Sequence, residues 1–253
     1  MRIRNGVQLS DTKTFNKKLN MISTVISVYN TQSDWLSQSI NSILNQEIDV
    51  DFEIILVDDG STNIETIETL NKYREYSNIK VITLEENRGI SFALNVGIAN
   101  SKYDIIARMD SDDISLPDRF KKQLEYLQNN PEVDLVGSNA AYLMLNGNDW
   151  VAPNQSTFHP EVITKEFARN SLWFFNHPTV MFRKESVTSV GGYDESLKGL
   201  AEDYELWMRM LRHNKELRNL PGVDLLFRIS PNSLTRKIKP ENHEFQLKLQ
   251  KTL

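Results

Sequence analysis

The stretch of sequence that decides the fold reads Asp104-Ile105-Ile106-Ala107-Arg108-Met109-Asp110-Ser111-Asp112-Asp113. Residues 105–109 have the length and isoleucine content of a buried strand, so the aspartates fall at its C-terminal end. Leu116-Pro117-Asp118 follows, and a proline with an acid in the next position is typical of the first turn of a helix. Carboxylate oxygens are preferred ligands of hard divalent cations, which also bind phosphates. The stretch therefore predicts a cation site, although an isolated Asp-x-Asp is more often a solvated turn.

Length, charge and composition limit the classes of protein. With 253 residues the chain can bury a full core, as one large domain or two closely packed halves. A net charge of −5 argues against nucleic acid as a partner, and the absence of cysteine excludes disulfides and cysteine zinc sites. We expect no signal peptide and no membrane span, because the start of the chain lacks an apolar run and no window approaches 18 apolar residues.

Strand and helix patterns alternate along the first half of the chain. Strands are expected at 24–30, 53–57, 80–84 and 105–109. Helices are expected from Ser33, around Ile64, Ile67 and Leu70, and over 91–99. This alternation predicts a doubly wound α/β half.

The second half has a less regular pattern. We expect helices at 120–130, 160–170 and 202–213, and strands at 134–145, 179–182 and 224–229, with a hairpin turn at 146–148 before 149–151. The tail from Lys237 carries Phe245, Leu249 and Leu253 at helical spacing. It could contact a membrane surface or a second subunit, or pack against its own domain.

Polar side chains follow three of the predicted parallel strands. They are Tyr29-Asn30, Asp58-Asp59-Gly60-Ser61 and Asp110-Ser111-Asp112-Asp113. Ligands of open parallel sheets bind at the C-terminal ends of the strands. Three such ends in one sheet favour a binding site over a chance collection of turns.

A second acidic group, Glu202-Asp203, begins a strongly patterned helix. Acids are common at the first turn of a helix because they face the positive end of its dipole. The alternative is a general base held rigidly at the helix start, with Trp207 one turn away on the same face.

Taken together, the motifs resemble family 2 glycosyltransferases. The motifs follow in order: Val28-Tyr29-Asn30, 52–62, Asn87-Arg88-Gly89, Asp110-Ser111-Asp112-Asp113 and 202–207. The resemblance covers residues 22 to about 236 and implies a GT-A fold, an α/β architecture in which helices flank a Rossmann-like mixed sheet. We expect a glycosyltransferase domain at 21–236, preceded by a polar arm at 1–20 and followed by an amphipathic tail at 237–253. Within the domain, 21–113 would bind the nucleotide-sugar and 114–236 the acceptor.

The resemblance also implies roles for individual residues. Asp203 matches the catalytic base, and Asp112 matches the ligand of Mn²⁺ or Mg²⁺. Donor contacts are implied for Ser27, Tyr29, Asn30, Asp59, Asp110 and Ser111. Arg88 and Arg108 are further donor candidates, or else a surface charge and a strand residue. Acceptor contacts are considered for Glu202, Trp207, Trp173 and His177, although Trp173 could be core and His177 structural. Ser230 stands where many relatives carry a histidine, which puts a histidine metal ligand there in doubt.

The implied activity is an inverting, metal-dependent transfer of a hexose or N-acetylhexosamine from a UDP-sugar. The acceptor would be a hydroxyl of a glycan, a lipid-linked glycan or a glycoprotein in bacterial surface polysaccharide or glycoprotein glycan synthesis. We expect a cytoplasmic protein, with peripheral contact at the inner face of the plasma membrane as an option. Two alternatives stay open. One is a haloacid-dehalogenase-like phosphatase, because Asp110–Ile114 loosely resembles its signature; the other is a non-catalytic nucleotide-sugar-binding assembly subunit.

Overall fold

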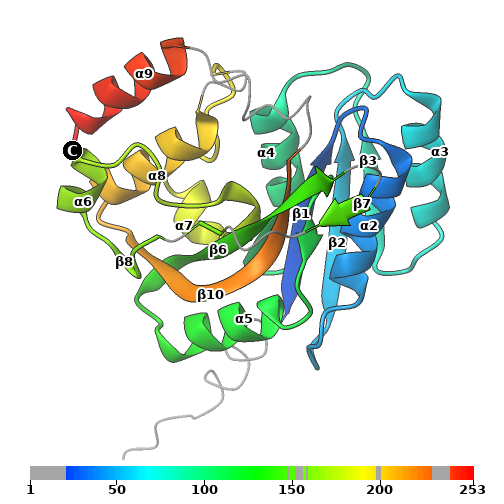
Figure 1. The fold of residues 1–253 in the computed structure, drawn as a ribbon, viewed down its shortest axis with the longest axis horizontal. Coiled ribbons are helices and arrows are strands. Elements are labelled where there is room, and N and C mark those ends of the chain that lie inside the picture. Colours follow the sequence, from blue (N-terminus) through cyan, green and yellow to red (C-terminus); the bar gives the residue numbers. More distant parts are fainter. Residues whose placement is uncertain (1–20, 147–148, 152–155, 158, 198–200, 230–239) are drawn as a thin grey trace, which may run out of the picture.

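A computed structural model describes residues 21–146, 149–151, 156–157, 159–197, 201–229 and 240–253 (Figure 1). The predicted arm at 1–20 and Ser230 lie outside the described residues.

The first half alternates strand and helix as predicted. In chain order it contains β1 (Ile22–Val28), α2 (Ser33–Leu44), β2 (Phe52–Asp58), α3 (Ile64–Tyr73), β3 (Ile79–Thr83), α4 (Ile90–Asn100) and β4 (Ile105–Asp110). The strands are parallel and lie in the order β3-β2-β1-β4. Because helices cover both faces of this sheet, its strands are apolar on both sides.

The second half continues the same sheet with strands of both directions. It contains β5 (Ile114–Ser115), α5 (Arg119–Asn129), β6 (Val133–Asn146), β7 (Asp149–Val151), β8 (Val162–Ile163), α6 (Lys165–Arg169), η1 (His177–Thr179), β9 (Met181–Arg183), α7 (Lys184–Thr188), α8 (Glu202–Arg212), β10 (Glu216–Ile229) and α9 (Pro240–Gln250). The order continues β4-β9-β6-β10-β5, and β9 is antiparallel to both β4 and β6. The result is the predicted mixed sheet.

Several expected elements of the second half were wrong in type or extent. The helix expected at 160–170 is instead the short strand β8 followed by the one-turn helix α6. Strand β10 begins at Glu216 rather than at Asp224, because it passes through Pro221-Gly222 with register shifts against β6. Proline and glycine usually interrupt a strand, so only the irregular pairing of β10 allows them. The short elements β5 and α7 were not predicted.

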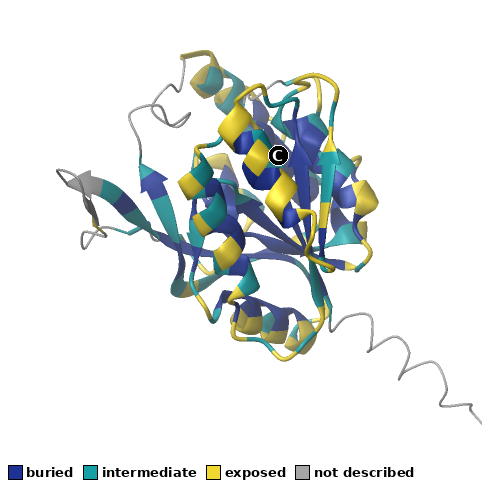
Figure 2. Cartoon of the chain, turned by 90° about the vertical axis from the view of Figure 1, so that its right-hand side faces the viewer, coloured by how far each residue is buried: buried dark blue, intermediate teal, exposed yellow. Residues whose placement is uncertain are grey.

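Two apolar cores fill the two faces of the sheet. Helices α2, α3 and α5 pack one face, with Leu36, Leu70 and Phe120 buried among them. Helices α4, α6, α7, α8 and α9 cover the other. Figure 2 shows the buried strands inside and the exposed residues on the outer sides of the helices.

The C-terminal tail, as far as it is described, packs against its own domain. Leu249 of α9 is buried in the same core as α8, and Phe245 and Leu253 pack against that core. Gln250 Nε2 also donates to the Ser171 carbonyl oxygen at 3.0 Å. The predicted apolar stripe therefore packs within the domain. Among the described residues, no helix has the length and apolar character needed to span a bilayer.

Candidate active site

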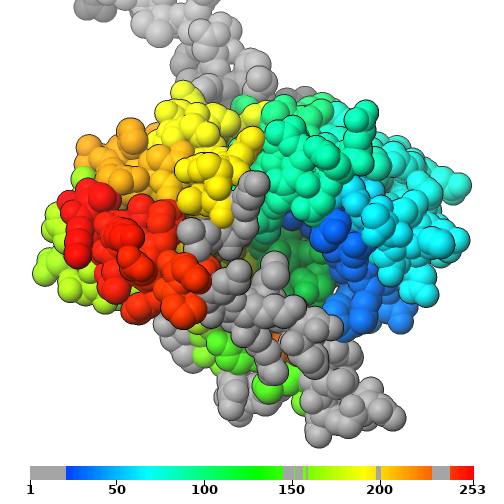
Figure 3. Space-filling model, turned by 90° about the horizontal axis from the view of Figure 1, so that it is seen from above, coloured from blue at the N-terminus to red at the C-terminus, as the bar shows by residue number. Residues whose placement is uncertain are grey.

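The parallel strands bring the predicted polar ends to one edge of the sheet. Ser27 of β1 lies opposite Asp110 of β4, and Val28 lies opposite Asp58 of β2. Beyond the strands, the hydroxyls of Thr31 and Ser111 are 2.7 Å apart. Seen from above in Figure 3, the surface is hollowed beside the blue and teal residues, with green atoms at the bottom of the hollow.

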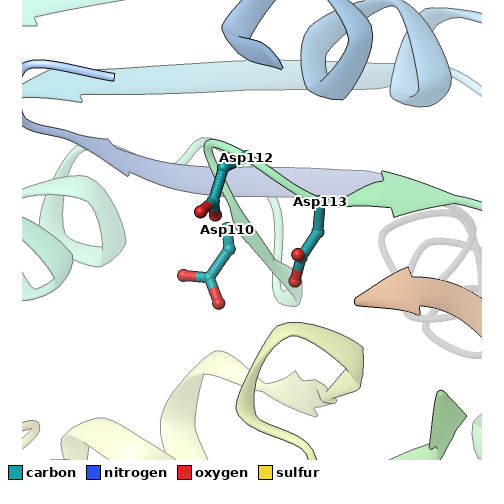
Figure 4. A group of neighbouring side chains, drawn as sticks. All are labelled: Asp110, Asp112 and Asp113. Carbon is teal, nitrogen blue, oxygen red and sulfur yellow. The ribbon is translucent and has the colours of Figure 1, made fainter. Parts of the chain in front are cut away.

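Three aspartates form the centre of this edge (Figure 4). Asp110, Asp112 and Asp113 each offer an oxygen, and these oxygens lie within 4.8 Å of one another. Burial, followed by the charge of Asp110, raises the pKa of Asp112 to about 6 and raises that of Asp113 well above its ordinary value. Within the described part of the chain, the buried Asp113 Oδ2 has no hydrogen-bond partner. Crowded carboxylates of this kind fit a hard divalent cation, which would relieve their mutual repulsion.

Arg108 is a buried cation beside the triad. Its Nη2 lies 2.5 Å from Asp110 Oδ1, and its side chain is 3% exposed. Among the described residues its Nε and Nη1 have no hydrogen-bond partner. The positive charge of Arg108 opposes the rise in the pKa of both Glu202 and Asp203, so Arg108 interacts electrostatically with the second acidic group as well. Arg108 is thus a buried residue of β4 with an ion-pair partner, and its role as a donor contact stays a prediction.

The second acidic group begins α8. Ala201 precedes it with a left-handed φ of 50°, an unusual conformation for a residue other than glycine. Burial, and then the charge of Asp203, raises the pKa of Glu202 to about 7. Burial also raises the pKa of Asp203, whose Oδ1 accepts a hydrogen bond from the Tyr204 amide at 2.7 Å. A carboxylate with a raised pKa in a fixed position can accept a proton from a weakly acidic hydroxyl.

Tyr193 and His177 pack beside Arg108. His177 Nε2 lies 2.8 Å from the Tyr193 hydroxyl. Burial, and then the charge of Arg108, lowers the pKa of His177 well below 6.5, so the ring is neutral. Asn95 of α4 holds the backbone of Tyr193 in place. Its Oδ1 accepts a hydrogen bond from the Tyr193 amide and its Nδ2 donates to the Tyr193 carbonyl oxygen, both at 2.9 Å.

The expected acceptor contacts divide into buried and exposed residues. His177 and Trp207 are both buried, and their rings pack edge to face with centroids 5.9 Å apart. Both rings are part of the core, and acceptor contacts from these two side chains stay a prediction. Trp173 is 51% exposed and packs edgewise on His159, whereas its neighbours Phe174 and Phe175 are core residues.

The loops that carry the expected donor contacts Asn30 and Asp59 are organised by side-chain to backbone hydrogen bonds. Both carboxylate oxygens of Asp59 accept backbone amides, from Arg88 at 2.8 Å and Gly89 at 2.9 Å. Asn30 Oδ1 accepts the amides of Thr62 and Asn63, each at 2.8 Å. These bonds fix the three loops around the strand ends.

Two exposed side chains remain on this side. Tyr29 is 51% exposed. The Arg88 guanidinium lies over the Phe92 ring, 3.4 Å from its centroid. A stacked guanidinium and an exposed aromatic ring are both suited to contact a planar, anionic ligand.

Sequence reasoning missed Arg228. This residue of β10 is buried, its backbone amide donates to Asp113 Oδ1 at 2.8 Å, and its Nε donates to the Asp112 carbonyl at 2.6 Å. A single arginine inside the apolar run Leu225-Leu226-Phe227-Arg228-Ile229 was the signal that could have revealed it.

Comparison with known proteins gives a consistent result. A family model described as Glycosyl transferase family 2 matches residues 23–191. The Amylovoran biosynthesis glycosyltransferase AmsE of Erwinia amylovora is 33% identical over 90% of this chain and 86% of its own length. The O-antigen biosynthesis glycosyltransferase WbnJ of Escherichia coli is 36% identical over 87% of this chain and 83% of its own.

A third relative and a solved structure extend the comparison. An Escherichia coli protein described as UDP-Gal:alpha-D-GlcNAc-diphosphoundecaprenol beta-1,3-galactosyltransferase is 32% identical over 85% of this chain and 76% of its own. Among solved structures, S. aureus TarS 1-349 in complex with UDP-GlcNAc aligns with a TM-score of 0.70 and 22% identity, covering 91% of this chain and 65% of that one. At that identity the likeness concerns the fold.

Proposed function

This chain belongs to glycosyl transferase family 2 and has the GT-A fold, and on that premise we propose that it is an inverting, metal-dependent transferase that uses a UDP-sugar. It moves a hexose or N-acetylhexosamine onto a hydroxyl of a glycan, lipid-linked or glycoprotein acceptor. The names of the relatives, which include amylovoran, O-antigen and a UDP-Gal donor, support bacterial surface polysaccharide synthesis with a UDP-linked donor. Family membership removes the phosphatase alternative.

The observation that carries the proposal is the approach of two acidic groups from opposite halves of the chain. Asp110 ends β4, Asp112 and Asp113 follow it, and Glu202 and Asp203 begin α8. Asp110 contributes to the raised pKa of both Glu202 and Asp203, so the two groups are close enough to interact electrostatically. An inverting transferase needs acidic groups on two sides of the sugar, because the diphosphate leaves on one side and the acceptor attacks from the other.

We assign the donor side to residues of the first half. Tyr29, Asp59 and Arg88 would surround the nucleobase, and Ser27, Asn30 and Ser111 would line the same strand ends. Asp110 and Arg108 would contact the sugar-nucleotide. Residues 21–113 are thus proposed as the nucleotide-sugar half and 114–236 as the acceptor half.

Asp112, with the carboxylates beside it, would hold Mn²⁺ or Mg²⁺. A bound divalent ion supplies Lewis-acid stabilisation of the negative charge that builds on the diphosphate as it leaves. The fit rests on the crowding of the three carboxylates.

Asp203 would act as the base on the acceptor side. The acceptor hydroxyl gives its proton to the Asp203 carboxylate while its oxygen forms a bond to C1 of the sugar. The bond between C1 and the β-phosphate oxygen breaks, and UDP carries away the electron pair. A single displacement of this kind inverts the anomeric centre and requires no covalent nucleophile.

Thermal unfolding with nucleotides tests the proposal directly. UDP, GDP and dTDP are compared, each with and without Mn²⁺, because a ligand at a hundred times its dissociation constant adds about 2.7 kcal/mol of stability. A shift with UDP that requires Mn²⁺ is expected, followed by UDP release from a UDP-sugar in the presence of acceptor. A nucleotide shift without turnover on any acceptor would favour the non-catalytic subunit, and no shift with any nucleotide would contradict the donor assignment.

A further inference from the structure

Arg228 joins three parts of the chain behind the aspartate triad. It lies on β10, which pairs with β5 through Leu226 and Ile114 directly after the triad. Its Nε donates to the Asp112 carbonyl at 2.6 Å, and its Nη2 donates to Gln38 Oε1 of α2 at 2.7 Å. One buried side chain therefore connects the loop at 111–113 to both a strand and a helix.

The guanidinium is itself held in place. The centroid of the Trp35 ring lies 5.2 Å from Arg228 Cζ, and Gln38 Oε1 accepts a hydrogen bond from Arg228 Nη2. Both partners belong to α2, a helix packed in the first core. A planar guanidinium that is fixed on one face and at one Nη has a defined orientation, which also fixes the direction of its Nε–H. Here that direction is the backbone of Asp112.

The loop needs such support because its side chains repel one another. Three carboxylates with oxygens within 4.8 Å favour a loop that opens and separates them. The Arg228 backbone amide also donates a hydrogen bond to Asp113 Oδ1 at 2.8 Å, so Arg228 contacts two successive residues of the loop. Groups that orient metal ligands from behind commonly change metal affinity by about 10–100-fold when they are lost.

We propose that Arg228 is a positioning residue that sets the divalent-cation affinity of the triad by fixing the backbone at Asp112 and Asp113. The inference rests on the proposed function, because it concerns the cation site assigned there. Arg228 touches neither donor nor acceptor in this proposal. It acts through the loop.

The test compares Arg228→Lys with Arg228→Met in the full chain. Lysine keeps the positive charge but lacks the fork that reaches Asp112 and Gln38 together, whereas methionine removes the charge. Mn²⁺ affinity is measured by the electron paramagnetic resonance signal of free Mn²⁺, in the presence of saturating UDP. If Arg228 fixes the loop, both variants bind Mn²⁺ at least about tenfold more weakly than the unaltered protein. Amide exchange in a peptide spanning 111–115 should accelerate in both.

The two variants separate this role from a purely electrostatic one. A cation beside a metal site repels the metal, so an effect of charge alone predicts tighter Mn²⁺ binding in Arg228→Met and unchanged binding in Arg228→Lys. Either of those results would overturn the inference. Failure of the unaltered protein to bind Mn²⁺ would instead contradict the cation site of the proposed function, so the two failures are distinguishable.

Arg183→Lys provides a matched control. Arg183 also donates from its side chain to backbone carbonyls, those of Val133 at 2.9 Å and Leu127 at 2.8 Å. It pairs with Ile105, at the end of β4 away from the triad. This variant should lose stability without any change in Mn²⁺ affinity.

A second variant covers the case in which Arg228→Lys fails to fold. Gln38→Leu leaves Arg228 in place and removes only the acceptor that orients its fork. We expect Mn²⁺ binding to weaken severalfold in this variant, in the same direction as in Arg228→Lys. Unchanged affinity in a folded Gln38→Leu protein would overturn the inference.

Discussion

Arg108 Nη2 lies 2.5 Å from Asp110 Oδ1, and both residues belong to β4, the strand that leads into the triad. The arginine is nearly inaccessible to solvent, at 2% exposure. Burying an arginine away from water is costly unless an acid compensates it. Its charge offsets part of the repulsion among the acids that meet here.

Arg108→Met should therefore destabilise the protein strongly. Removing one partner of a buried ion pair costs about 3–5 kcal/mol, because the remaining charge has no compensation. Urea denaturation at neutral pH measures the change. The control is Arg218→Met, which breaks the more exposed pair with Glu216 at 2.8 Å and should cost under about 1 kcal/mol. Equal losses in the two variants would show that Arg108 does not compensate the buried acids.

Asp203→Asn should abolish transfer while leaving UDP binding intact. The amide cannot accept the acceptor proton, and loss of a general base reduces turnover by about 10²–10⁴-fold. UDP release reports turnover, and calorimetric titration with UDP and Mn²⁺ reports donor binding. Glu185→Gln, which changes an exposed acid in the first turn of α7, is the control and should have neither effect. Near-normal turnover in Asp203→Asn would remove the base assignment.

Glu202 should make the stability of the free protein depend on pH. Its pKa is raised to about 7 in the folded state, while the unfolded chain ionises near its ordinary value of 4.5. Between those pH values the folded protein holds a proton that the unfolded chain has lost. The contribution of Glu202 to stability is therefore full below its unfolded pKa of 4.5 and is lost as the pH rises through its folded pKa of about 7.

Urea denaturation between pH 4.5 and pH 8 measures this contribution as the difference between the unaltered protein and Glu202→Gln. The variant keeps the shape of the side chain and cannot ionise. The free energy of unfolding of Glu202→Gln, relative to that of the unaltered protein, should increase as the pH rises to about 7. A difference that stays constant over the whole range would mean that Glu202 ionises normally in the folded protein.

The parts of the fold and site that were predictable are those in which local pattern and tertiary context agree. Residues 105–109 are apolar and end in acids, and β4 is a buried strand with the triad at its end. The alternation of strand and helix and the order of the motifs were sufficient to identify the family.

The rest depended on contacts between distant parts of the chain. The strand was expected only at 224–229, yet β10 extends back through Pro221-Gly222 to Glu216 because β6 pairs with it along most of its length. Trp207 lies one turn beyond Asp203, as expected, but the packing of Phe175 and His177 around it makes it a core residue. Arg228 is far from Asp112 in sequence, and only the pairing of β10 with β5 brings them together.

Gly60 supplies a prediction about the loops around the donor side. It has a φ of 70°, and an added Cβ would lie 2.4 Å from the backbone carbon of Glu86. Gly60→Ala must therefore move the 86–89 turn, whose amides bind Asp59. Gly89 is the matched control, because its φ is 92° but nothing lies within 4 Å of an added Cβ. Gly89→Ala should cost only the backbone strain of its conformation, about 1–3 kcal/mol, and Gly60→Ala, which adds the close contact, distinctly more.

The two glycine variants should also differ in UDP binding. Displacing the turn removes hydrogen bonds from Asp59, which we assign to the nucleobase, so Gly60→Ala should weaken UDP binding about tenfold or more. The stability and the UDP affinity of each variant are measured by thermal unfolding and calorimetric titration. If Gly60→Ala loses stability but binds UDP normally, the close contact is relieved without moving Asp59, and the turn does not position Asp59 for the nucleotide. If both variants bind UDP equally weakly, backbone strain is sufficient to explain the loss, and the close contact with Glu86 has no separate role.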